Sequence, residues 1–400
     1  MRELASWLSG DRRPDAFPYD AVVAEFRRTG KHFVAKDLLV QLDQVRRTAV
    51  PPARAQAAGR FLRDFLDVTL DKFDGRYDYQ TYLALSLIRL PDDPATVRRR
   101  HDELTVQLIA DALRFELAAA SGATESLPRQ RPGLKLVTKR YRLGVRAFAP
   151  ALGRLGLLTT TATDPAITAA QLCDVVLSAQ GATERRALDA SMLPVDQVHD
   201  EYLFIRVLQG YETTFAALAV ELGQAVAEVT AGQADAAAER LAYARRLLDG
   251  AAPLFSLMAT VQPESFRTFR VYTEGASAIQ SRSYKRVESL CRSPATDRLD
   301  SMAYRSVPEI RDTVVAGQPS LDEAYRSAGL SGSQRALLGR RMTEFGAALL
   351  QWRQTHYRIA VRMLGTRPGT GYTEGTPYLA AVRDLPVFAQ PDEPQQEEPT

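Results

Sequence analysis

The chain has 400 residues, of which 45% are hydrophobic and 25% charged, a composition typical of globular proteins. Its net charge of +3 comes from 51 basic and 48 acidic residues spread along the chain, so no strongly basic surface for nucleic acid is indicated. The N-terminus lacks an apolar run of signal-peptide length, and no later segment approaches the roughly 18 uncharged apolar residues of a membrane helix. We therefore expect a cytoplasmic protein with no membrane and no nucleic-acid partner.

Residues that commonly bind metals are few. The cysteines are Cys173 and Cys291, which form no Cys-x-x-Cys pair, so neither a disulfide framework nor a zinc site is indicated. Four histidines, at positions 32, 101, 199 and 356, are too scattered for a multi-histidine metal centre. A haem iron needs only one axial histidine, and no Cys-x-x-Cys-His motif signals covalent attachment.

The first 160 residues read as helices with short breaks. Helical periodicity covers residues 21–28, 36–47, 53–72 and 98–120, and strand signals are scarce throughout, so we predict an all-α fold. No catalytic constellation stands out here, and we expect a structural or oligomerisation domain. The basic run at 129–146 is expected to form a solvated linker or a face against an acidic neighbour.

A short helix at 170–180 precedes a longer one that begins at His199-Asp200-Glu201. Helical spacing puts one apolar face on the longer helix. Plain core packing explains such a face as well as a ligand site does. Its members are Phe204, Leu208, Tyr211, Phe215, Leu218 and Leu222.

A third block runs from Pro263 through Phe266, Arg267 and Arg270 to an Ala-Ser-Ala-Ile-Gln-Ser segment at 276–281. An isolated arginine is most often part of a surface ion pair, so this block says little by itself. Residues 292–335 look like a variable excursion.

The last predicted helix contains a histidine directed inward. Apolar residues recur with helical spacing from Phe345 to Met363, and His356 lies on the same stripe. Such a histidine is either a core residue bonded to a backbone carbonyl or a proximal haem ligand. A glycine-rich loop, 365–375, follows and would let backbone groups approach a ligand, or simply end the helix. The acidic, proline-rich tail at 389–400 is expected to be disordered.

These blocks together resemble the tryptophan 2,3-dioxygenases. The C-terminal signature of that family is a Trp-Arg-x-x-His helix leading through Arg-Met-(Ile/Leu)-Gly into Gly-Thr-Gly. Residues of this chain that fall in register include Trp352, Arg353, His356, Gly369, Thr370 and Gly371. The resemblance implies a haem domain over about residues 164–385, preceded by the helical N-terminal domain at 1–160. It also implies a homo-oligomer, either dimer or tetramer.

The resemblance implies roles for individual residues. His356 would be the axial ligand of a non-covalent haem b, with Trp352, Gly369 and Gly371 also contacting the cofactor. Arg270, rather than Arg267, would hold the carboxylate of an aromatic amino acid. Phe204 and Phe266 would sandwich the aromatic ring, and Thr370 would bind the ammonium or carboxylate group. Molecular oxygen would be the co-substrate, and L-tryptophan or a modified tryptophan would be converted to an N-formylkynurenine.

One departure from the family pattern bears on the choice of substrate. Leu208 stands where the family has a distal histidine in His-Gln-x-Tyr-Glu. Leucine accepts no hydrogen bond, so an indole N–H buried there would cost about 1–3 kcal/mol unless another group accepts it. We therefore also consider a related monooxygenase or rearranging enzyme acting on a modified tryptophan or tyrosine. A third alternative is a non-catalytic haem-binding or sensor protein.

The N-terminal region contains echoes of the same family. Tyr79, Tyr82, Leu83 and Leu85 match a Tyr-x-x-Tyr-Leu-x-Leu arm, and a second His-Asp-Glu block begins at His101. A degenerate internal repeat or a displaced arm would explain both.

Overall fold

A computed structural model describes residues 2–49, 57–157, 162–365, 369 and 375–389. These parts of the chain are helical and contain no strand, which confirms the all-α prediction. An isolated backbone bridge joins Arg129 to Val198. The α-helices are α1 (Arg2–Ser9), α2 (Tyr19–Thr29), α3 (Lys36–Ala49), α4 (Ala57–Thr69), α5 (Tyr79–Tyr82), α6 (Val97–Ala120), α7 (Leu134–Leu155), α8 (Pro165–Ala179), α9 (Ala182–Ala190), α10 (His199–Thr230), α11 (Ala234–Met258), α12 (Pro263–Arg270), α13 (Arg282–Cys291), α14 (Thr296–Leu299), α15 (Met302–Arg305), α16 (Pro308–Val315), α17 (Leu321–Ser327), α18 (Gly332–Leu364) and α19 (Thr376–Arg383).

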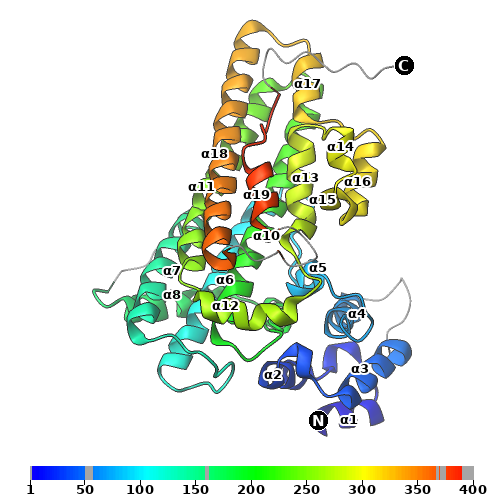
Figure 1. Cartoon of the computed structure of the whole chain (residues 1–400), viewed down its shortest axis with the longest axis vertical. Coiled ribbons are helices and arrows are strands. Elements are labelled where there is room, and N and C mark those ends of the chain that lie inside the picture. Colours follow the sequence, from blue (N-terminus) through cyan, green and yellow to red (C-terminus); the bar gives the residue numbers. More distant parts are fainter. Residues whose placement is uncertain (1, 50–56, 158–161, 366–368, 370–374, 390–400) are drawn as a thin grey trace.

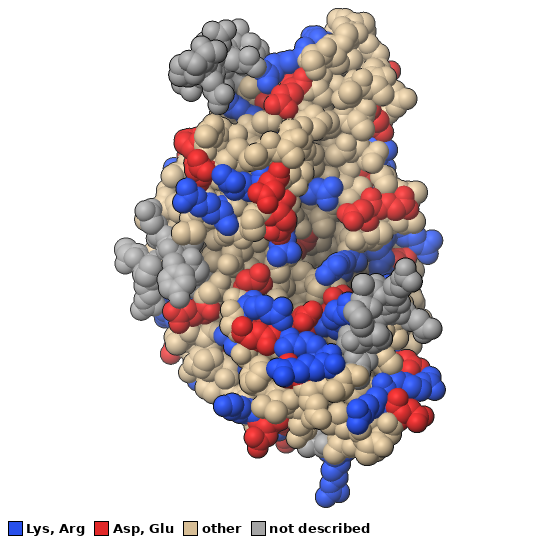
Figure 2. Space-filling view, turned by 90° about the vertical axis from the view of Figure 1, so that its right-hand side faces the viewer, with Lys and Arg blue, Asp and Glu red and all other residues tan. Residues whose placement is uncertain are grey.

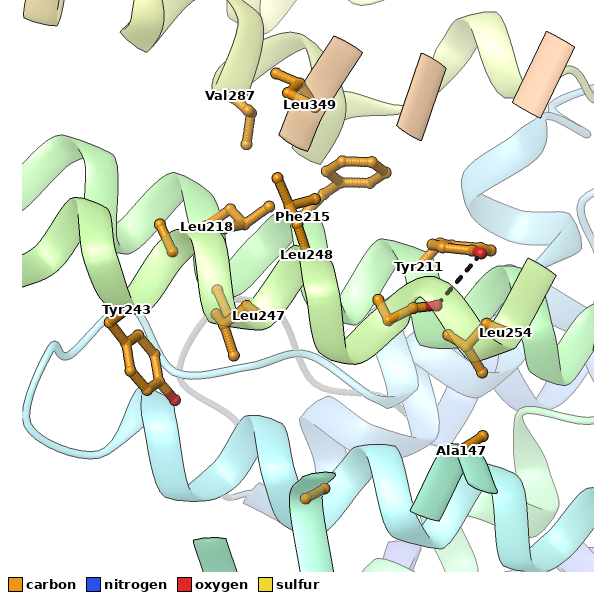
Figure 3. Packing of buried hydrophobic residues seen from close by; sticks show 14 of the residues in the cluster. Ala147, Tyr211, Phe215, Leu218, Tyr243, Leu247, Leu248, Leu254, Val287 and Leu349 are labelled. Atoms are coloured by element: carbon orange, nitrogen blue, oxygen red, sulfur yellow. Dashed lines mark hydrogen bonds between the residues drawn. The ribbon is translucent and has the colours of Figure 1, made fainter. Parts of the chain in front are cut away.

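Helix α10 lies at the centre of the molecule. It contains no proline over 32 residues, and its buried side chains face neighbours on all sides. Helices α6, α11 and α13 pack against it, and α18 runs along α11 (Figure 1). Figure 3 shows Phe215 and Leu218 of α10 close to Leu248 of α11, with Leu349 of α18 above them. The helices that carry the three sequence blocks therefore share one core.

The first four helices form a smaller hydrophobic cluster at the blue end of the molecule (Figure 1). A buried ion pair between Lys31 Nζ and Asp71 Oδ2, 2.6 Å apart, lies beside this cluster. Helices α6 and α7 also precede residue 160, yet they belong to the main core with α10. The domain division near residue 160 stays a prediction.

The two His-Asp-Glu blocks contact each other's helices in a reciprocal way. His101 Nε2 of α6 lies 3.4 Å from Thr214 Oγ1 of α10, and His199 Nε2 of α10 lies 3.1 Å from Glu116 Oε2 of α6. His101 and His199 are as far apart in sequence as Glu116 and Thr214. A pair of repeats related by a two-fold axis would produce this exchange of partners, and the repeat itself stays a prediction.

The basic run at 129–146 is not a linker. Most of it lies in α7, where Arg140 is fully buried. Its guanidinium group donates to Glu116 Oε1 at 2.5 Å and to Asp200 Oδ1 at 2.7 Å. The other expectation, a basic face against acidic neighbours, is right for this arginine because a buried guanidinium group requires anionic partners.

The face of the molecule in Figure 2 carries basic and acidic side chains interspersed. None of the described helices combines the length and the apolar content that a bilayer crossing requires.

Candidate active site

One cavity of about 260 Å³ collects residues from all three sequence blocks. Its walls come from α5, α10, α11, α12, α13, α18 and α19, and most of its lining is apolar or aromatic. Every described residue that the sequence assigned to a site lines this cavity. They are Phe204, Leu208, Phe266, Arg270, Trp352, His356 and Gly369.

His356 faces the cavity from the last third of α18. Its imidazole stacks on Trp352, with ring centroids 5.1 Å apart and an angle of 19° between the planes. Burial lowers the pKa of His356 to about 4, so the ring is neutral at pH 7. No hydrogen bond joins His356 to another residue of the described chain, whereas a core histidine would be bonded to a carbonyl group. A neutral imidazole with free nitrogen atoms is the form that binds a metal.

Helix α18 is fixed in place beside the cavity by the residue after Trp352. Arg353 Nε donates to the hydroxyl of Tyr284 at 2.6 Å, and its Nη1 donates to the carbonyl oxygen of Leu385 at 2.7 Å. The Trp352 ring packs on Tyr284 at 5.6 Å between centroids and meets Phe215 edge-on at 4.9 Å. These contacts hold the Trp352 ring that supports His356.

The predicted apolar face of α10 supplies a second wall. Phe204, Leu208, Tyr211 and Phe215 line the cavity, and the Tyr211 hydroxyl is 3.5 Å from the Ala251 carbonyl oxygen (Figure 3). The predicted face is therefore correct for these residues.

The two aromatic residues predicted to sandwich the substrate ring lie against each other in this structure, and the sandwich itself stays a prediction. The Phe204 and Phe266 rings touch, with centroids 5.5 Å apart, and Phe204 also contacts Phe269 at 5.2 Å. A ring held between two others would need them about 7 Å apart, twice the usual contact distance. Phe204 and Phe266 form one aromatic wall because α12 packs directly on α10.

The two arginines of the third block differ in position. Arg270 ends α12 and lines the cavity, while Arg267 is exposed one turn earlier. An arginine at the edge of an apolar cavity can bind a carboxylate through two parallel hydrogen bonds. The geometry is compatible with the role that the family resemblance gives to Arg270.

The N-terminal region supplies two cavity residues, although the sequence showed no catalytic constellation there. Tyr79 and Tyr82 line the cavity from α5, a single turn capped by Asp78. Gln280 anchors this turn, because its Oε1 accepts from the Tyr79 backbone N–H at 3.1 Å and its carbonyl oxygen accepts from Gln80 at 3.1 Å. In the sequence, the match of these residues to the Tyr-x-x-Tyr-Leu-x-Leu arm was the signal that could have indicated their place in the cavity.

A charged cluster borders the cavity. Glu288 pairs with Lys285 at 3.0 Å and with Arg298 at 2.9 Å, and Arg298 also donates to the Tyr378 hydroxyl at 3.2 Å. Burial alone would raise the pKa of Glu288, but the neighbouring cations, Arg353 among them, lower it to about 2. Arg298 comes from the segment read as a variable excursion, and sequence spacing gave no sign of it.

The residues present fit a haem better than a metal ion held by protein side chains alone. The described part of the chain has no group of three or more His, Cys, Asp or Glu residues suited to a metal ion. A haem iron is already held by its porphyrin and needs one protein ligand, which His356 can supply. The aromatic lining suits a flat apolar ring system, and the Trp352 Nε1 atom is buried with no hydrogen-bond partner in the described structure.

Some predicted features lie outside the described residues. They are Thr370 and Gly371 of the glycine-rich loop and, apart from Ala389, the predicted disordered tail.

Comparison with known proteins confirms the family resemblance. No family model matches the chain. Tryptophan 2,3-dioxygenase of Pseudomonas aeruginosa is 27% identical over 242 residues, covering 51% of this chain and 84% of the relative. The enzyme of the same name from Polaromonas sp. is 26% identical over 234 residues, covering 49% and 80%, and that of Anaeromyxobacter dehalogenans is 27% identical over 237 residues, covering 50% and 88%. The prediction that the chain resembles an enzyme family is confirmed by these names.

Proposed function

Because about half of the chain is similar to tryptophan 2,3-dioxygenases, we propose that it is a haem-dependent oxygenase of an aromatic amino acid. The observation that carries this proposal is the position of His356. Its neutral imidazole, which has no hydrogen bond to any described residue, lines the same cavity as the aromatic wall of α10 and the guanidinium group of Arg270. The residues proposed as cofactor ligand and substrate clamp therefore line one cavity.

The protein would contribute binding, orientation and exclusion of water. Arg270 would hold the substrate carboxylate, Thr370 the ammonium or carboxylate group, and the wall of Phe204 and Phe266 would contact the ring. Trp352 and Gly369 would contact the cofactor. When bound, haem would supply the iron chemistry that activates dioxygen. Fixing the ring and the cofactor in one cavity replaces a random encounter by an oriented one.

The reaction we favour is dioxygenation of the indole ring. Both oxygen atoms of one dioxygen molecule would be added to C2 and C3 while the bond between them breaks, giving an N-formylkynurenine. No external reductant is needed, because the four electrons that reduce dioxygen come from the substrate.

A second candidate follows from Leu208, which lines the cavity where the family has a histidine. A relative that transfers one oxygen atom or rearranges its substrate would act on a modified tryptophan or a tyrosine. Haem-loaded protein should therefore be incubated with a panel of aromatic amino acids under ¹⁸O-labelled dioxygen. The product masses are then measured by mass spectrometry. Two labelled atoms in a product from an indole substrate support dioxygenation, and one labelled atom supports the second candidate. Haem-loaded protein that turns over no aromatic amino acid would contradict both.

A further inference from the structure

A buried carboxyl group shares the cavity with Leu208. Glu212 lies one helical turn after Leu208 on α10, and residues four apart occupy the same side of a helix. Its side chain lines the cavity and is 4% exposed. The Oε2 atom is buried and has no hydrogen-bond partner among the described residues. This carboxyl group therefore has acceptor capacity that the folded chain does not use.

Among the described residues, the surroundings of Glu212 are polar but include no cation that compensates its charge. The hydroxyl groups of Ser281, Tyr79 and Ser283 lie within hydrogen-bonding reach of the carboxyl group, while its Oε2 atom has no partner among the described residues. Burial raises the pKa of Glu212 to about 7, although these hydroxyls oppose the rise. No ion pair to Glu212 is present in the described part of the chain, and Lys285, which also lines the cavity, is paired with Glu288.

Burying a carboxyl group without a cation costs stability, so structural packing alone does not explain it. The hydroxyl groups around Glu212 could hold a smaller amide or hydroxyl side chain equally well. Perturbed carboxyl groups that line a cavity are more often functional than those in a closed core. The unused acceptor oxygen points to a donor that arrives with the ligand.

We propose that Glu212 accepts a hydrogen bond from the ring of the substrate and so selects aromatic amino acids that carry a ring donor such as an indole N–H. This inference rests on the proposed function. It assigns to Glu212 the contact that Leu208 cannot make, from the next turn of the same helix. A ring whose nitrogen is methylated would leave the carboxyl group unpaired and would place a methyl group against it.

This inference and the prediction from Leu208 alone give opposite results for one ligand. If the wall were wholly apolar, 1-methyltryptophan would suffer no penalty relative to tryptophan. If Glu212 is the acceptor, the methyl group abolishes the bond, and tryptophan is preferred.

The test measures binding of L-tryptophan and 1-methyl-L-tryptophan to the haem-loaded full chain by calorimetry without dioxygen. Wild type should prefer tryptophan by roughly tenfold or more. Glu212→Leu should weaken tryptophan binding and bring the ratio close to one. Glu212→Gln keeps a carbonyl acceptor and should retain part of the preference. Glu201→Gln is the matched control, since Glu201 is also buried on α10 with a pKa raised to about 8, mainly by burial, but it does not line the cavity.

The outcomes separate the inference from the function on which it rests. If wild type binds both ligands equally well, the proposed function stands and the role of Glu212 is overturned. A preference for tryptophan that survives in Glu212→Leu overturns it as well. If wild type binds no aromatic amino acid, the proposed function fails and the inference fails with it. If the Glu212→Leu chain does not fold, Glu212→Gln supplies the variant comparison, and equal binding of both ligands by wild type overturns the role of Glu212 without any variant.

Discussion

Leu208 and Glu212 lie one turn apart on α10, and both line the cavity that His356 lines from α18. An apolar side chain and a carboxyl group that forms no ion pair with any described residue therefore lie side by side in the cavity wall. This pairing distinguishes the wall from the family pattern, in which a histidine occupies the position of Leu208. It makes the choice of substrate depend on two neighbouring residues rather than one.

Replacing Leu208 by histidine should shift the preference of the protein further towards unmodified tryptophan. The imidazole would add an acceptor to the cavity wall, and matching one buried donor is worth about 1–3 kcal/mol, or roughly ten- to two-hundredfold in kcat/KM. The measurement compares tryptophan with 1-methyltryptophan in wild type and Leu208→His. An unchanged ratio of kcat/KM values would show that residue 208 does not contact the ring.

Removing the guanidinium group of Arg270 should weaken substrate binding far more than removing that of Arg267. Arg270 lines the cavity, where loss of a desolvated charge pair costs roughly 2–5 kcal/mol, whereas an exposed arginine contributes roughly 0–1 kcal/mol. Binding of tryptophan to Arg270→Leu and Arg267→Leu, followed by calorimetry, checks this difference. The two variants serve as controls for each other, and equal affinities would refute the assignment.

The stability of the folded chain should fall between about pH 4.5 and pH 7 because of Glu212. Burial raises its pKa to about 7 from the ordinary value near 4.5, so in this window the folded chain keeps a proton that the unfolded chain releases. Stability from this group is therefore present below about pH 4.5 and is lost as the pH rises. The loss is roughly 3.5 kcal/mol at most, at about 1.4 kcal/mol per pKa unit.

Urea unfolding of wild type and Glu212→Gln across this range measures the effect. The free energy of unfolding of the variant should increase relative to that of wild type as the pH rises from 4.5 to 7. Parallel curves for the two proteins would mean that Glu212 titrates normally and is not buried as described.

The sequence predicted a helix, and the side of it that is buried, where apolar residues recur at helical spacing within that one helix. The stripe from Phe204 to Phe215 follows from spacing within α10, and the inward direction of His356 follows from spacing within α18. Tyr79 and Tyr82 were not predictable in this way. Their helix is a single turn, too short to show a period, and it reaches the cavity through Gln280, which is distant in the sequence.

Contacts between residues far apart in the sequence also determine which charged residues are buried. Arg140 belongs to a run that looks solvated by composition, and only its buried partners Glu116 and Asp200 reveal its place in the core. Glu212 was visible as part of a family motif, but its burial and its unused oxygen atom depend on packing of α5 and α13 against α10. The spacing of residues in the sequence shows which of them share one side of a helix, but it does not show which other elements pack on that side.

Haem binding by His356 is the most direct test of the central claim. Wild type, His356→Ala and His32→Ala should be reconstituted with haem, and haem content and Soret absorption compared. His32 is a matched control because it packs against Phe33 and Tyr272 and does not line the cavity. We predict one haem per chain in wild type and His32→Ala, and loss of haem or a changed ligand spectrum in His356→Ala. Equal haem content with an unchanged spectrum in His356→Ala would contradict the assignment of this cavity as a haem site held by His356.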